Sequence, residues 1–179
     1  SLAVVDGNPA IAYFDAVARD PMYVRATDAV GGAWATPIAV DTEDEEGWYV
    51  SLAVVAGNPA MSYFDVINGH LEYVRATDAQ GTAWGTPLTV DAATDVGWYT
   101  SLAVVDGMPA ISYYDNANED LKYIRATDAQ GTTWGSPVTV DSDGNVGLET
   151  SLAVVDGRPA IGYLDGSILA LKVAWATDA

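Results

Sequence analysis

The sequence of 179 residues contains no cysteine, which excludes a disulfide framework and any metal site built from thiolates. Basic residues are scarce as well: seven Lys and Arg stand against 25 Asp and Glu, and the formal net charge is −18. A surface of this charge repels phosphate backbones, so we expect no nucleic-acid partner. It suits a secreted or salt-exposed protein, and we expect an extracellular or cell-surface location.

Long apolar runs are also missing, although half of the residues are hydrophobic. None approaches the roughly 20 residues that a membrane-spanning helix needs, so we expect no membrane partner. Helical periodicity is absent from every part of the chain. The hydrophobic content indicates a folded core rather than a disordered chain, and the length suits one domain.

One unit of 50 residues is repeated along the chain without insertions. The run "SLAVVDGNPAIAYFD" begins at Ser1, and near-copies begin at Ser51, Ser101 and Ser151. Each complete unit has four short runs of β character, which in the third unit read "SLAVV", "PAISYYD", "LKYIRATD" and "SPVTVD". The pair Asp106-Gly107 predicts a turn after the first run, and Gly131 predicts a hairpin between the third and fourth.

Four antiparallel strands per unit, repeated in tandem, are typical of a β-propeller. We therefore predict an all-β fold of one domain, residues 1–179. Its four-stranded blades are expected at 1–50, 51–100 and 101–150, followed by a partial blade at 151–179 that lacks its outer strand. The tryptophans at 34, 84 and 134 are expected to pack between blades. A β-solenoid has shorter coils, and a β-trefoil has three units where a fourth begins here.

The hairpin "TDAQGTTW", which ends at Trp134, resembles the Asp-box of sialidase-type propellers, Ser-x-Asp-x-Gly-x-Thr-Trp. The spacing from Asp128 to Gly131 is one residue longer than in that box, and Ala126 stands in the place of its Ser. More broadly, the unit is similar to the blades of highly repetitive bacterial β-propellers. The resemblance implies the fold and implies little about chemistry.

The pattern of charged residues argues against catalysis. A sialidase needs an arginine cluster, a tyrosine nucleophile with an acidic partner, and a separate acid/base Asp. Here Arg25, Arg75 and Arg125 are repeat-equivalent, with Trp175 in their place in the last unit, so they spread around a ring. We expect each Arg to stack on aromatic rings or to pair with an Asp of a neighbouring blade. With His70 as the only histidine, we predict no enzyme activity.

Loops on one side of the predicted ring differ between units, whereas those on the other side are nearly uniform. The variable side holds the second-to-third loops, such as "DVINGHLE", and the blade-to-blade connections, such as "DTEDEEGWY". It also holds 17 of the 25 acidic residues: Asp15, Asp20, Asp41, Glu43, Asp44, Glu45, Glu46, Asp65, Asp91, Asp95, Asp115, Glu119, Asp120, Asp141, Asp143, Glu149 and Asp165.

Aromatic pairs lie among these carboxylates, at the end of two connections and just before an inner strand. Rings stack on the apolar faces of sugars, and carboxylates accept hydrogen bonds from sugar hydroxyls. The sequence therefore predicts a non-catalytic module that binds an extracellular partner, with carbohydrate as the first candidate. Its candidate site residues are Trp48, Tyr49, Trp98, Tyr99, Asp65 and Asp115. Alternatively, the aromatic residues wedge adjacent blades together.

The run "DSDGNVG" resembles the start of a calcium loop, because oxygen ligands alternate at Asp141, Asp143 and Asn145. A complete loop needs a later bidentate Glu, and Glu149 is not at the usual spacing. We expect no cofactor other than a calcium ion at these three residues.

The incomplete fourth unit predicts association between chains. An open arc of four blades exposes an apolar inter-blade surface at each end, and such surfaces are rarely left uncovered. We predict a homo-oligomer in which two chains form an eight-bladed ring, with a four-bladed monomeric ring as the alternative. A purely structural role in such an assembly is the alternative function, and a glycosidase-like enzyme is the weaker one.

Overall fold

The computed structural model describes residues 1–42 and 46–177, which form four antiparallel β-sheets in chain order. The first sheet contains β1 (Leu2–Val5), β2 (Asn8–Asp15), β3 (Asp20–Arg25) and β4 (Ile38–Ala39). The second contains β5 (Glu46–Val55), β6 (Asn58–Asp65), β7 (His70–Arg75) and β8 (Leu88–Asp91). The all-β prediction is confirmed: the described residues contain no helix, and therefore none with the length and apolar character of a membrane span.

The last two sheets repeat this order. The third contains β9 (Val96–Val105), β10 (Met108–Asp115), β11 (Asp120–Arg125) and β12 (Val138–Asp141). The fourth contains β13 (Val146–Val155), β14 (Arg158–Asp165) and β15 (Ala170–Trp175), and no outer strand among the described residues. Four sheets agree with the predicted number of blades.

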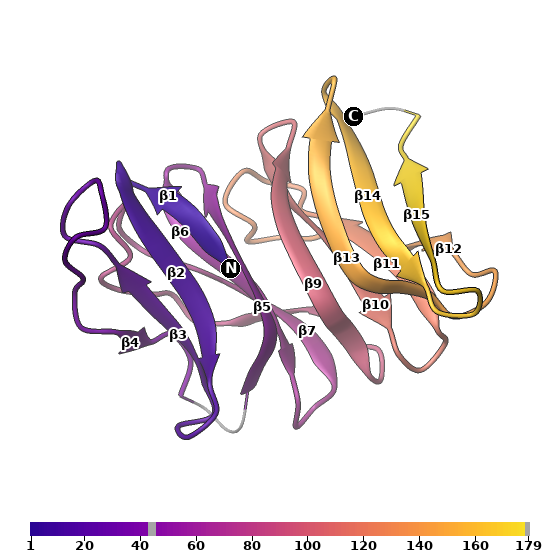
Figure 1. Ribbon diagram of the computed structural model, residues 1–179, viewed down its shortest axis with the longest axis horizontal. Helices are drawn as coiled ribbons and strands as arrows, with labels where there is room; N and C mark the ends of the chain where they lie inside the picture. The colour runs from indigo at the N-terminus through magenta and orange to yellow at the C-terminus, as the bar shows by residue number, and fades with distance from the viewer. Residues whose placement is uncertain (43–45, 178–179) are drawn as a thin grey trace.

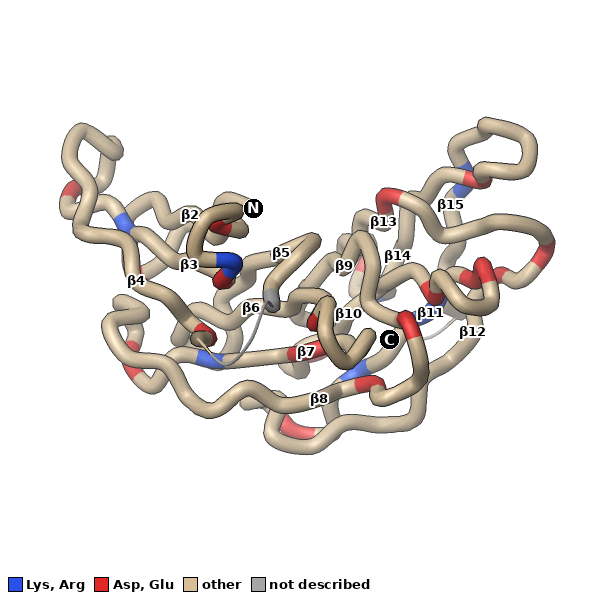
Figure 2. Tube along the Cα trace, turned by 90° about the horizontal axis from the view of Figure 1, so that it is seen from below, with Lys and Arg blue, Asp and Glu red and all other residues tan. Residues whose placement is uncertain are grey.

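The sheets follow one another in a curved row, with the first and fourth at opposite ends of the molecule (Figures 1 and 2). The long inner strands β5, β9 and β13 lie side by side near the middle of Figure 1. The described part of the chain is therefore an open arc, and the first sheet does not pair with the fourth.

The strand register repeats with the sequence. The first two strands of each sheet pair Leu2 with Ile11, Leu52 with Met61, Leu102 with Ile111, and Leu152 with Ile161. The two-residue turn after β9 places Asp106 and Gly107 at φ values of 48° and 76°. Positive φ at both residues matches the twist of a tight hairpin, so this predicted turn is confirmed.

The inner strands begin five residues earlier than the sequence predicts. We expected them to start at Ser51, Ser101 and Ser151, but β5, β9 and β13 begin at Glu46, Val96 and Val146. A bulge breaks the register within each strand. At the bulge Tyr49 and Tyr99 have φ values of 56° and 51°, and this conformation interrupts the alternation of side chains between the two faces of the sheet. A search for alternating apolar and polar residues therefore misses the first part of each inner strand.

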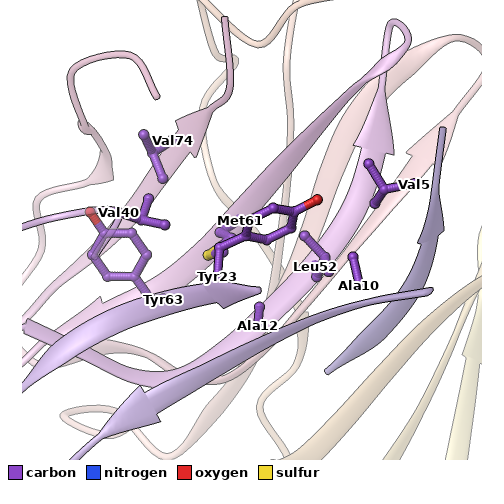
Figure 3. Packing of buried hydrophobic residues seen from close by; sticks show 9 residues of the cluster. All are labelled: Val5, Ala10, Ala12, Tyr23, Val40, Leu52, Met61, Tyr63 and Val74. Carbon is purple, nitrogen blue, oxygen red and sulfur yellow. The ribbon is translucent and has the colours of Figure 1, made fainter. Parts of the chain in front are cut away.

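The core lies between consecutive sheets rather than inside any one of them. Between the first two sheets, Val5, Ala10, Ala12, Tyr23, Val40, Leu52, Met61, Tyr63 and Val74 form one buried cluster (Figure 3). Equivalent clusters follow at the next two interfaces. The rings of Trp84 and Tyr23 make an edge contact at 5.2 Å between centroids, and Trp134 and Tyr73 one at 5.1 Å. The predicted packing of these two tryptophans between sheets is confirmed.

Candidate functional site

Three repeat-equivalent side chains line one hollow on the inner strands. Tyr49 on β5, Tyr99 on β9 and Glu149 on β13 occupy the same position of the repeat, and each has a positive φ at the bulge of its strand. Their strands are neighbours, so these side chains meet across a shallow cavity of about 210 Å³. Glu149 is exposed there, while both tyrosines are half-buried.

The two tyrosines belong to a continuous aromatic cluster. The ring of Tyr49 stacks on that of Trp98, with 5.5 Å between centroids and 29° between planes. It also lies 4.5 Å from the ring of Tyr99, which in turn lies 6.3 Å from that of Tyr114. The cluster therefore joins side chains from the second and third sheets and exposes phenol groups beside the carboxylate of Glu149.

The phenol of Tyr49 is held in its protonated form. Burial raises the pKa of Tyr49 to about 12, and the neighbouring Tyr99 hydroxyl and the negative charges of Glu149 and Asp95 act in the same direction. At neutral pH the group is a hydrogen-bond donor. It is poorly suited to act as a phenolate nucleophile, because removal of its proton is disfavoured.

The tryptophans predicted as ligand-binding platforms have different surroundings. Trp98 is half-buried: its Nε1 donates to Asp95 Oδ1 at 2.8 Å, and its ring lies 5.6 Å from that of Phe64 in the neighbouring sheet. Trp48 is 41% exposed and lies beside a separate hollow of about 290 Å³, which Phe14 and Val66 also line. Trp98 thus contributes to the contact between sheets, whereas Trp48 presents a ring to solvent.

Asp65 and Asp115, also predicted to bind the ligand, are buried at the ends of β6 and β10. Asp65 Oδ1 accepts hydrogen bonds from the amides of Ile67 and Asn68. Asp115 Oδ1 accepts one from the Asn118 amide, and its Oδ2 lies 3.0 Å from the Nζ of Lys122. Both carboxylates are buried and hydrogen-bonded by their own loops, and their role in ligand binding stays a prediction.

The variable loops and the connections between sheets lie together, as expected. The amide of Asn116 donates to the Asp95 carbonyl, and the amide of Gly166 donates to that of Asn145. Asn116 Nδ2 also donates to Asp95 Oδ2 at 2.6 Å. Three of the predicted acidic residues, Glu43, Asp44 and Glu45, lie outside the described residues.

The residues of the predicted calcium loop have other partners. Asp141 Oδ2 accepts hydrogen bonds from Tyr163 Oη at 2.6 Å and Lys172 Nζ at 3.2 Å. Asn145 Oδ1 accepts one from Tyr114 Oη at 3.1 Å. The backbone amide of Asp143 donates to Asp141 Oδ1 at 3.0 Å. An ammonium group therefore already balances the charge of Asp141, and the calcium ion stays a prediction.

The repeat-equivalent arginines pair with the turns of their own sheets rather than with an Asp of a neighbouring blade, and stacking on aromatic rings stays a prediction. Arg25 Nε donates to the Val5 carbonyl at 2.8 Å, and Arg75 Nε donates to the Val55 carbonyl at the same distance. Arg125 lies 3.3 Å from Asp106. Each Arg on a third strand is close to the turn after the first strand, and that turn offers carbonyl or carboxylate acceptors.

One trio of side chains near the start of β7 brings imidazole and carboxylate groups together. Asp65, His70 and Glu72 each place a potential ligand atom within 4.8 Å of the others. Glu72 is buried, and its Oε1 accepts a hydrogen bond from Thr89 Oγ1 at 2.6 Å. Lys122 and Lys172 occupy the equivalent position in the next two repeats, where each pairs with the equivalent Asp.

The sequence places Glu149 among the acidic residues of the variable side but does not predict it as a site residue. The repeat itself marks this position, because Glu149 is equivalent to Tyr49 in the first unit and to Tyr99 in the second. Strand bulges decide that these three side chains meet, and bulges leave no simple mark in the sequence.

Comparison with known proteins identifies the fold. No protein-family model matches the chain, and no curated protein matches it. Among solved structures, the neighbours include β-propeller glycoside hydrolases. The catalytic domain of the GH62 α-L-arabinofuranosidase of Coprinopsis cinerea superposes with a TM-score of 0.66 at 14% identity, over 97% of this chain and 61% of that one.

Two sialidases also superpose on this chain at low sequence identity. The Hadza microbial sialidase Hz136 matches with a TM-score of 0.66 at 16% identity, over 99% of this chain and 44% of that one. The K499G mutant of NanB sialidase from Streptococcus pneumoniae matches with a TM-score of 0.65 at 12% identity, over 97% and 29%. The chain thus spans less than two thirds of each of these proteins, and the likeness supports a propeller-like arrangement of its sheets.

Proposed function

We propose that this chain is a non-catalytic, extracellular binding module that recognises carbohydrate through the hollow between β5, β9 and β13. The observation that carries the proposal is the meeting of Tyr49, Tyr99 and Glu149 on three adjacent strands. Tyrosine rings offer a flat apolar surface with a polar edge, and an exposed carboxylate accepts hydrogen bonds from hydroxyl groups. This combination suits a sugar, which has an apolar face and a rim of hydroxyls.

Two observations favour binding over catalysis. The raised pKa of Tyr49 supports a donor role rather than a nucleophilic one. Arg25 and Arg75, which would have to converge on a substrate carboxylate in a sialidase-like enzyme, are held by the turns of their own sheets. Turnover of a fluorogenic sialoside or arabinofuranoside, lost on Glu149→Gln, would contradict a non-catalytic role.

A glycan array, run with and without calcium, tests the proposal. Glu149→Gln removes the charge of an exposed side chain and keeps its shape, so the fold is expected to be unaffected. A hydrogen bond to a charged acceptor contributes about 1.5–3 kcal/mol and one to a neutral acceptor about 0.5–1.5 kcal/mol, so the change from carboxylate to amide predicts a fall in affinity of roughly five- to tenfold. Asp156→Asn is the matched control, because Asp156 is also an exposed carboxylate but lies in the turn between β13 and β14.

Glycan binding that falls with Glu149→Gln and persists with Asp156→Asn supports carbohydrate binding in the hollow between β5, β9 and β13. Binding that survives both substitutions places the site elsewhere. The absence of any glycan signal from the unsubstituted protein contradicts the proposed function.

A further inference from the structure

The chain repeats one kind of interface three times, between consecutive sheets. We call the face that a sheet turns toward the preceding sheet its N-side face, and the opposite face its C-side face. At the first interface, Leu52 and Met61 on the N-side face of the second sheet pack on Ala10, Ala12 and Tyr23 of the first. Two faces have no neighbouring sheet in the described chain. They are the N-side face of the first sheet and the C-side face of the fourth.

A serine–leucine hydrogen bond marks each interface. The amide of Leu52 donates to Ser1 Oγ at 3.1 Å. In the same way the amide of Leu102 donates to Ser51 Oγ, and that of Leu152 donates to Ser101 Oγ, both at 3.0 Å. One more contact of this kind needs the hydroxyl of Ser151, at the C-side end, and the amide of Leu2, at the N-side end.

The N-side face of the first sheet exposes residues whose counterparts are buried. Leu2 is 69% exposed, whereas Leu52, its equivalent in the second sheet, is 5% exposed. Trp34 and Val4 are exposed on the same face, while Trp84, the counterpart of Trp34, packs on Tyr23 of the preceding sheet. The face thus has the residues of an interface, and no sheet among residues 1–42 and 46–177 covers them.

The C-side face of the fourth sheet shows the complementary pattern. Leu171 is 81% exposed, whereas Leu121, its equivalent, is completely buried. Val155, Val173 and Trp175 are exposed on the same face. Large apolar side chains exposed together on one face are typical of a surface that binds another protein.

We propose that the N-side face of the first sheet binds the C-side face of the fourth sheet in a second copy of this chain. The partner is specified by the chain itself, because three internal interfaces already join the same two kinds of face. The contact is head to tail, with Leu2 of one copy beneath Ser151 of the other and Trp34 against Val173. This inference does not depend on carbohydrate binding.

The shape of the arc indicates closure with two copies. The first and fourth sheets rise on the same side of the molecule (Figure 2), so a second copy turned by 180° meets both ends at once. A heterologous contact that closes in this way gives a finite ring, whereas one that does not close gives a filament. Each chain has a net charge of −18, so repulsion opposes assembly and added salt is expected to strengthen it.

The mass of the protein in solution, measured by light scattering at micromolar concentration in 150 mM and 500 mM NaCl, tests the proposal. The expected mass is twice the 18.8 kDa of one chain, with the larger fraction of pairs at the higher salt concentration. A mass of 18.8 kDa in both buffers overturns the proposal, and so does an assembly larger than two chains.

Two charge substitutions then test the head-to-tail arrangement. Leu2→Lys alters only the N-side end and Val173→Lys only the C-side end; both positions are exposed in the single chain, so folding is not expected to suffer. Each variant alone is expected to have the mass of one chain. An equimolar mixture is expected to regain some pairs, because one contact joins the intact C-side face of Leu2→Lys to the intact N-side face of Val173→Lys. The other contact of the ring carries both lysines, so the fraction of pairs is expected to stay below that of the unsubstituted protein.

Val17→Lys is the control, because it adds the same charge in the exposed loop after β2. It is expected to leave the mass at two chains. Like-to-like pairing predicts that one of the two end variants keeps the doubled mass, which contradicts head-to-tail contact. A mixture with the same fraction of pairs as the two variants measured separately also contradicts it.

Discussion

The hydroxyl of Tyr73, on β7, donates a hydrogen bond of 3.0 Å to the backbone carbonyl of Gln130 in the next sheet. Tyr23 makes the same contact with Gln80 one repeat earlier. The equivalent hydroxyl of Tyr123 is buried and has no hydrogen-bond partner among residues 1–42 and 46–177. Within these residues, the repeated tyrosine is therefore hydrogen-bonded to the next sheet at Tyr23 and Tyr73 and unpaired at Tyr123.

This difference predicts opposite effects of one substitution. Tyr73→Phe removes a hydrogen bond between sheets and leaves the Gln130 carbonyl without its donor, so it should lower the free energy of unfolding by about 0.5–1.5 kcal/mol. Tyr123→Phe removes an unpaired buried hydroxyl and should leave stability unchanged or raise it. Urea unfolding of both variants makes the comparison; equal destabilisation would show that the Gln130 contact contributes nothing.

A second prediction concerns Glu72, which faces Asp41, Asp65 and His70 in a buried position. Burial, with a smaller contribution from the charges of Asp65 and Asp41, raises the pKa of Glu72 to about 7 in spite of the Thr89 hydrogen bond, which lowers it. The unfolded chain releases this proton near pH 4.5, and the folded chain does so near pH 7. The contribution of Glu72 to the free energy of unfolding is therefore expected to fall from pH 4.5 to pH 7 and then to level off.

Two variants check this prediction by thermal unfolding across that pH range. Glu72→Gln removes the titration and should flatten the curve. Glu72→Lys restores the residue type of Lys122 and Lys172 and should stabilise the fold at pH 8 by about 0.5–2 kcal/mol, since it pairs a cation with Asp65. A wild-type curve with the same slope as that of Glu72→Gln would refute the role of Glu72.

A third prediction separates backbone strain from steric overlap at two glycines. Gly107 and Gly131 have nearly equal φ values, 76° and 75°, so alanine costs about 1–2 kcal/mol at each through the left-handed backbone alone. A Cβ at Gly107 has no neighbour within 4 Å, whereas one at Gly131 would lie 2.7 Å from Cε1 of Tyr73. Gly131→Ala should therefore be the more damaging by about 1–3 kcal/mol. Equal losses in denaturant unfolding would mean that the hairpin moves away from Tyr73 at little cost.

A fourth prediction concerns acid stability. Burial alone would raise the pKa of Asp128, but hydrogen bonds from the side chains and amides of Thr133 and Thr132 outweigh it and hold the pKa below 3.8. The group therefore stabilises the fold above pH 3.8, and this contribution is lost as the pH falls further. Asp128→Asn should reduce the loss of thermal stability between pH 4 and pH 2.5. An unchanged acid profile would show that this hairpin does not limit acid stability.

The repeat in the sequence determined most of the architecture. A period of 50 residues with four β runs predicted the number of sheets, the turn at Asp106-Gly107 and the packing of Trp84 and Trp134. These features are local, or they recur in every copy, so one pattern specifies them all. The resemblance of the hairpin to an Asp-box stays a prediction.

The tertiary structure decided which side chains meet and which are accessible. Asp65 and Asp115 look like surface ligands in the sequence, but their loops fold over them, because a buried carboxylate needs the amide donors that those loops supply. Tyr49, Tyr99 and Glu149 lie 50 residues apart and converge only because strand bulges turn them toward one hollow. Such convergence depends on the packing between sheets, which no single repeat contains.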